Sequence, residues 1–160
     1  MNEDITFTSD ADKSIRYAEI IPQIKHLISG ETNLIANLSN ITAVLKSVFN
    51  FYWVGFYLVD GTQLVLGPFQ GTLACTRIPK GRGVCGVSWE KKETLIVPDV
   101  LKFAGHIACS SLSKSEIVVP MIQNDDVIGV LDVDSEHLAT FDTTDAKYLK
   151  EIVDIIISNK

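Results

Sequence analysis

The hydrophobic periodicity of the chain changes twice, and this change limits its possible folds more than any other feature. Apolar residues recur at helical spacing over residues 11–24 and 34–48, which predicts two helices, with Pro22 either starting or kinking one of them. Aromatic and β-branched runs separated by turn residues follow, which predicts strands. An amphipathic stretch over residues 142–156, capped by Asp142 or Thr143, predicts a third long helix.

The middle of the chain is predicted to be a meander. Asp60 and Gly61 are predicted to form a turn between strands, and residues 67–71 are predicted to be a loop. Residues 98–115 are predicted to be a loop that carries function, because this segment is too long and too mixed in composition for a simple connection. The other predicted elements are strands at 51–59, 63–66, 74–78, 95–97, 117–122 and 127–133, and a short helix at 84–92.

This order of elements predicts an α+β fold with the terminal helices on one face of a largely antiparallel sheet. Gly-rich and Cys-bearing loops would cover the other face and enclose a small-molecule cavity. A chain of 160 residues fits one domain, which we place at residues 11–160, after a loose N-terminal arm at residues 1–10.

Charge and hydropathy disfavour several functional classes. A net charge of −6 disfavours binding to nucleic acid, and no apolar run approaches the length of a membrane span. The acidic N-terminus lacks the apolar run of a secretory signal, so we expect a cytoplasmic protein. Three cysteines in a reducing compartment would not form a permanent disulfide framework.

Cys75, Cys85 and Cys109 all lie at loops or element edges beside small residues, which predicts accessible thiols. A single cysteine of this kind is more often a packing residue, but three in one small chain weaken that interpretation. The spacing contains no Cys-x-x-Cys pair, and His106 is the one imidazole near Cys109, so no metal site is assigned. Redox chemistry remains, and the residues alone leave the nucleophile open between Cys85 and Cys109.

Acidic and aromatic residues share the predicted sheet. Asp132 and Asp134 alternate with apolar residues and therefore lie on one strand face, and Glu116 opens the neighbouring strand. Three acids in a water-poor pocket would bind an amine, and one of them could stay protonated as a donor, although an exposed sheet face explains the pair equally well. Trp53 and Tyr57 also share one strand face, beside the small Gly55, and are as readily explained as core residues.

Taken together, these residues resemble the free methionine-(R)-sulfoxide reductases, which are single GAF domains. The resemblance runs from the second predicted helix to the C-terminus. It departs at Ala104, where the family commonly has Pro, and at Ser110, where Asp is common. The strings that carry it are Trp53-Val54-Gly55-Phe56-Tyr57, Gly67-Pro68-Phe69-Gln70-Gly71, Gly81-Arg82-Gly83-Val84-Cys85-Gly86, Gly105-His106-Ile107-Ala108-Cys109, Ser115-Glu116-Ile117-Val118-Val119-Pro120 and Gly129-Val130-Leu131-Asp132-Val133-Asp134-Ser135.

The resemblance implies a GAF fold and an oxidoreductase acting on free methionine-(R)-sulfoxide without a cofactor. It implies that Cys109 is the nucleophile, which becomes a sulfenic acid, and that Cys75 or Cys85 resolves it as a disulfide. Thioredoxin would recycle that disulfide, a role linked to oxidative stress. Independently of the resemblance, a carboxyl kept neutral by burial and like-charged neighbours is a reasonable proton donor, and Glu116 is the first candidate.

By the same resemblance, substrate contacts come from both groups of sheet residues. Trp53 and Tyr57 would surround the substrate methyl group, while Glu116, Asp132 and Asp134 would meet the sulfoxide and the amine. The apolar stripes of the N-terminal helices are compatible with a homodimer. The alternative is a GAF module that binds a small ligand without turnover, and the three loop thiols argue against it.

Overall fold

The computed structural model describes residues 4–159. It contains four α-helices, six strands and one short 3-10 helix within this range. The helices are α1 (Lys13–Leu27), α2 (Leu34–Phe49), α3 (Gly83–Lys91) and α4 (Thr143–Ser158), and the 3-10 helix is η1 (Val100–Lys102). The strands are β1 (Trp53–Asp60), β2 (Gln63–Gln70), β3 (Arg77–Pro79), β4 (Leu95–Val97), β5 (Ser115–Gln123) and β6 (Asp126–Ser135).

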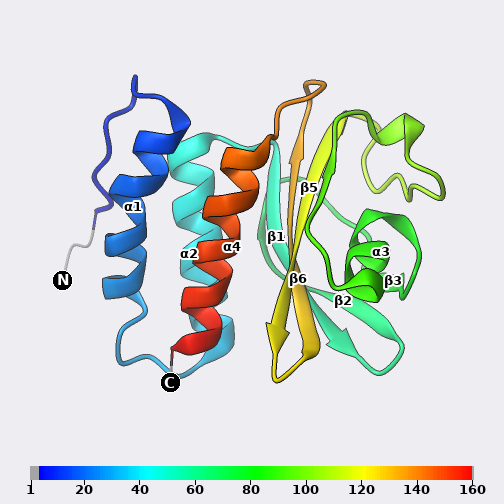
Figure 1. Cartoon of the computed structure of the whole chain (residues 1–160), viewed down its shortest axis with the longest axis horizontal. Helices are drawn as coiled ribbons and strands as arrows, with labels where there is room; N and C mark the ends of the chain where they lie inside the picture. The colour runs from blue at the N-terminus through cyan, green and yellow to red at the C-terminus, as the bar shows by residue number, and fades with distance from the viewer. Residues whose placement is uncertain (1–3, 160) are drawn as a thin grey trace.

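The six strands form one antiparallel sheet in the order β3-β2-β1-β6-β5-β4. Helices α1, α2 and α4 lie on one side of this sheet, and α3 lies with the long loops on the other side (Figure 1). This is the predicted α+β architecture, with helices on one face and loops on the other.

Local sequence signals explain where the long helices begin. Asn33 caps α2 by accepting a hydrogen bond from the Ala36 backbone N–H, and Asp142 forms a capping box with Asp145 at the start of α4. Pro22 lies inside helix α1, so the predicted alternative in which this proline starts a helix is wrong.

The region around β2 and β3 differs from the sequence prediction. Residues 67–70, predicted as loop, extend β2 and pair with β1, while β3 is confined to Arg77–Pro79 instead of residues 74–78. The ladder between β2 and β3 covers only Gln63 to Val65 on β2. Because the outer side of β2 has no ladder partner at Pro68, a proline is tolerated there within a strand.

Alternation along the central strands divides the apolar residues between two cores. On β5 and β6, Ile117, Val119, Leu131 and Val133 face the helices and pack in the larger core. The residues between them face the loops, where a second core includes Trp53 and elements of α3. This period of two fixes which side chains reach the loop-covered face.

The segment before α1 forms no helix or strand but contacts the rest of the domain. The Thr6 and Thr8 backbone N–H groups donate to the side chains of Gln23 and Glu19 on α1. Ile5 and Phe7 pack against the larger core. Residues 4–10 are therefore attached to α1, and the first three residues of the predicted loose arm lie outside the described range. Within residues 4–159, no helix has the length and apolar character needed to cross a membrane.

Candidate active site

Strand register brings the three predicted acids together on the loop-covered face. Asp134 on β6 pairs with Trp53 on β1 and with Glu116 on β5, so these three positions form one row across the sheet. Asp132 pairs with Gly55 and lies on the same face one step along β6. The sequence prediction that the two aspartates share a strand face is confirmed, and Glu116 joins them.

An aromatic wall borders the acids. The ring centroids of Trp53 and Tyr57 are 6.0 Å apart, and the ring of Phe69 stacks on Trp53 at a centroid distance of 5.4 Å. A Cβ atom at Gly55 would lie 2.5 Å from Cη2 of Trp53 and 2.4 Å from Cβ of Phe69. Glycine is therefore required at this position for the indole to lie over the strand.

Burial controls the protonation of the acid cluster. Glu116 is 5 % exposed and Asp132 6 %, and burial, followed by repulsion from the neighbouring carboxylates, raises the pKa of both well above their ordinary values. Burial also raises the pKa of Asp134 to about 6, against a hydrogen bond of 2.6 Å from the Ser113 hydroxyl, which lowers it. These raised pKa values favour protonated carboxyls in the cluster, so that one of its members can donate a proton while another accepts a cation.

One oxygen of the cluster lacks a partner. Oδ1 of Asp132 is buried and makes no hydrogen bond to any residue in the range 4–159. A buried carboxylate oxygen without a donor is costly, and a ligand that brings N–H or O–H groups into the pocket would satisfy it.

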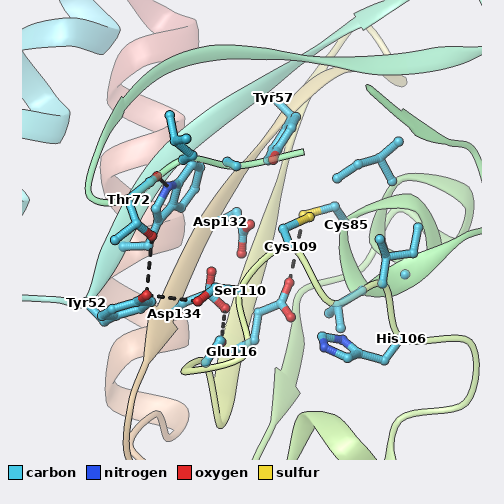
Figure 2. A pocket seen from close by; sticks show the side chains of 18 residues that line it. Tyr52, Tyr57, Thr72, Cys85, His106, Cys109, Ser110, Glu116, Asp132 and Asp134 are labelled. Carbon is cyan, nitrogen blue, oxygen red and sulfur yellow. Dashed lines mark hydrogen bonds between the residues drawn. The ribbon is translucent and has the colours of Figure 1, made fainter. Parts of the chain in front are cut away.

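The structure pairs two of the three cysteines. Cys75 follows β2 and Cys109 lies in the loop between η1 and β5, and their sulfur atoms form a disulfide with a Cα–Cα distance of 5.3 Å. Cys109 is exposed and Cys75 half-buried, as the prediction of accessible thiols requires. Both loops border the acid pocket (Figure 2).

Cys85 does not fit that prediction. It lies on α3, is 3 % exposed, and its thiol donates to Oε1 of Glu116 at 3.9 Å. Burial, together with repulsion from Asp132 and Glu116, raises the pKa of Cys85 well above its ordinary value. A thiol held neutral in this way is a poor nucleophile, so the choice that the sequence left between Cys85 and Cys109 favours Cys109.

Several residues that line the pocket carried no signal in the sequence. Ser113 contacts Asp134, and the Tyr52 hydroxyl contacts Oγ of Ser110 at 2.9 Å and Oγ1 of Thr72 at 3.3 Å (Figure 2). Tyr52 lies just before β1, where strand alternation does not yet apply, and the others lie on irregular loops. Ser110, where the resembled family commonly has Asp, contributes a hydroxyl contact to the loop instead of a charge.

The pocket also contains a group of metal-ligand type. Ligand atoms of Cys85, Glu116 and Asp132 lie within 4.8 Å of one another. Such a group can hold a divalent cation, but the same oxygen atoms can also bind an ammonium group. A cation and an ammonium group cannot occupy these atoms at the same time. His106 lines the pocket as well, and burial lowers the pKa of its imidazole.

Comparison with known proteins agrees with this geometry. Residues 33–157 match the GAF domain family. GAF domain-containing protein A of Dictyostelium discoideum is 59% identical over 98% of this chain and 99% of its own length. The free methionine-R-sulfoxide reductase of Escherichia coli K12 is 43% identical over 89% of this chain and 87% of its own.

A solved structure is also closely similar. The free methionine-R-sulfoxide reductase of Neisseria meningitidis, in complex with its substrate, superposes with a TM-score of 0.95. The two sequences are 55% identical, over 98% of this chain and 95% of that one. The resemblance based on the sequence strings is thereby confirmed, and the chain belongs to the free methionine-R-sulfoxide reductases of the GAF domain family.

Proposed function

We propose that the protein reduces free methionine-(R)-sulfoxide to methionine. The observation that carries this proposal is the position of the Cys75–Cys109 pair at the border of a pocket that contains the buried acids Glu116 and Asp132 and the half-buried Asp134. The relatives named free methionine-R-sulfoxide reductases support the substrate and the R configuration.

The reaction begins at Cys109. The oxygen of the sulfoxide is transferred to its sulfur: a bond between the Cys109 sulfur and this oxygen forms, the S–O bond of the substrate breaks, methionine leaves, and Cys109 becomes a sulfenic acid. The substrate sulfur is reduced by two electrons and Cys109 is oxidised by two. Exposure of Cys109 and its place beside the pocket support this role, which burial denies to Cys85.

Cys75 then resolves the sulfenic acid. Its sulfur attacks Cys109, the S–O bond breaks, the S–S bond forms, and the oxygen leaves as water. The disulfide between these two residues supports Cys75 over Cys85 as the resolving thiol. A dithiol reductant of the thioredoxin type would restore both thiols by exchange.

The acids and aromatic rings divide the remaining work. Glu116 is the proton donor to the sulfoxide oxygen, because burial raises the pKa of its carboxyl well above its ordinary value and so favours the protonated form. Asp132 and Asp134 bind the substrate ammonium, and Oδ1 of Asp132 lacks any other donor among residues 4–159. Trp53 and Tyr57 form the apolar wall for the methyl group.

The proposal is tested by NADPH consumption with thioredoxin, thioredoxin reductase and racemic free methionine sulfoxide. We expect turnover, and chiral chromatography of the remaining substrate should show loss of the R epimer alone. N-acetylmethionine sulfoxide, which lacks the ammonium group, should be a poor substrate. Loss of the S epimer, or tight binding of methionine sulfoxide without turnover, would contradict the proposal, and the second result would favour a ligand-binding GAF module.

A further inference from the structure

The hydroxyl of Tyr52 lies between the two loops that carry the paired cysteines. It is 3.3 Å from Oγ1 of Thr72, three residues before Cys75, and 2.9 Å from Oγ of Ser110, which directly follows Cys109 (Figure 2). A tyrosine hydroxyl can donate one hydrogen bond and accept another, so it can serve both contacts at once.

The two loops differ in how firmly the sheet holds them. The Cys75 loop is bound to β1 at two further points, because Nε1 of Trp53 donates to the Thr72 carbonyl at 3.0 Å and the Tyr57 hydroxyl donates to the Cys75 carbonyl at 2.9 Å. The Cys109 segment lies in irregular chain between η1 and β5, and Cys109 is exposed. Its one side-chain hydrogen bond to the sheet within residues 4–159 comes from Ser113, four residues after Cys109, which donates to Asp134 on β6. Contact with Tyr52 therefore fixes the less constrained loop relative to the more constrained one.

The position of Tyr52 itself is well supported. Tyr52 directly precedes Trp53, the first residue of β1. Nζ of Lys46 on α2 also donates to the backbone carbonyls of Phe51 and Tyr52. The hydroxyl thus extends from the residue directly before β1 toward the two loops whose cysteines form the disulfide.

We propose that Tyr52 is a positioning residue that holds Cys109 beside Cys75 for formation of the disulfide. The chemical step rests on the proposed function: sulfur of Cys75 attacks the Cys109 sulfenic acid, the S–S bond forms, and the oxygen takes a proton and leaves as water. Tyr52 acts through the loops, by raising the effective concentration of one sulfur near the other.

The expected size of the effect follows from ordinary hydrogen bonds. Each such bond shifts an equilibrium by roughly three- to tenfold after competition with water. Loss of both contacts from a partly exposed hydroxyl should therefore weaken the Cys75–Cys109 disulfide by about tenfold relative to an external thiol.

The first test needs no substrate, so it is independent of the proposed function. The protein is equilibrated with mixtures of reduced and oxidised glutathione, and the Cys75–Cys109 disulfide is quantified by alkylation and mass spectrometry. Tyr52→Phe, which keeps the ring, should lower the equilibrium constant about tenfold. Ser110→Ala should act in the same direction, and Ser111→Ala, at the next exposed serine of the loop, should have no effect.

The second test follows a single turnover of the reduced protein with methionine sulfoxide and no recycling reductant. Tyr52→Phe should slow disulfide formation more than methionine release, so that more Cys109 sulfenic acid is trapped by dimedone. An equilibrium constant and a trapped fraction that both match the wild type, in Tyr52→Phe with wild-type circular dichroism, would overturn the proposal. If that variant misfolds, Ser110→Ala decides. Absence of methionine release from the wild type would refute the proposed function, while the glutathione measurement would still judge the role of Tyr52.

Discussion

Replacing Asp134 by Asn should stabilise the protein at neutral pH while impairing its site. Burial raises the pKa of Asp134 from 3.8 to about 6. An acid whose pKa is higher in the folded state binds more protons there than in the unfolded chain, so the free energy of unfolding falls as pH rises between these two values. Above pH 6 the penalty is fully present, and below 3.8 it is absent.

The size of the penalty follows from the shift. A difference of about two pKa units at 1.36 kcal/mol each gives about 3 kcal/mol at pH 7.5. Asn removes the charge and keeps an oxygen that can accept the hydrogen bond from Ser113. We therefore expect Asp134→Asn to raise the free energy of unfolding by roughly 1–3 kcal/mol at pH 7.5, with the difference from the wild type shrinking toward pH 4.

Urea unfolding of the reduced proteins, followed by tryptophan fluorescence at pH 7.5 and pH 4.5, would measure this difference. Asp154→Asn is the matched control, because Asp154 is exposed on α4 in a pair with Lys150 at 2.6 Å and should change stability little. Two results would refute the argument that the Asp134 carboxylate is held ionised at a cost. One is an Asp134→Asn variant less stable than the wild type at pH 7.5, and the other is a variant whose stability equals that of the wild type at both pH values.

Four further outcomes are expected from the site geometry. Cys109→Ser should abolish methionine formation, whereas Cys75→Ser should still release about one methionine per protein in a single turnover, because sulfoxide attack precedes resolution. Cys85→Ala should retain multiple turnover in the thioredoxin-coupled assay, since Cys85 lies outside the disulfide. Glu116→Gln should lower kcat by roughly 10²-fold in steady-state kinetics, as loss of a general acid does. Gly55→Ala should lower the free energy of unfolding by about 1–3 kcal/mol in urea, because its Cβ would lie 2.4 Å from a neighbouring side-chain atom.

The sheet half of the site could be predicted from the sequence because strand geometry has a fixed period. Alternation places Asp132 and Asp134 on one face of β6, and Trp53 and Tyr57 on one face of β1, whatever the rest of the chain does. Pairing between β5 and β6 places Glu116 opposite Asp134. The sequence indicates that the two strands are neighbours but does not fix the register between them.

The loop half could not be predicted in the same way. Small neighbours around Cys85 suggested an accessible thiol, but here they allow close packing: a Cβ at Gly86 would lie 2.4 Å from the Pro79 carbonyl oxygen. Glycine beside a cysteine thus indicates either access or tight burial, and only the packing of α3 decides between them. The pairing of Cys75 with Cys109 depends likewise on loop paths that have no period.

The negative charge of the pocket affects both the stability of the protein and the kind of substrate that the pocket would favour. None of the ion pairs among residues 4–159 involves Glu116, Asp132 or Asp134, so this part of the chain supplies no paired cation to the three acids. A free amino acid brings an ammonium group that neutralises one carboxylate and can donate to Oδ1 of Asp132. A methionine within a polypeptide has an uncharged amide at that position, which cannot neutralise a carboxylate. We therefore expect the same uncompensated charge that lowers stability to favour a free amino acid over a protein-bound residue.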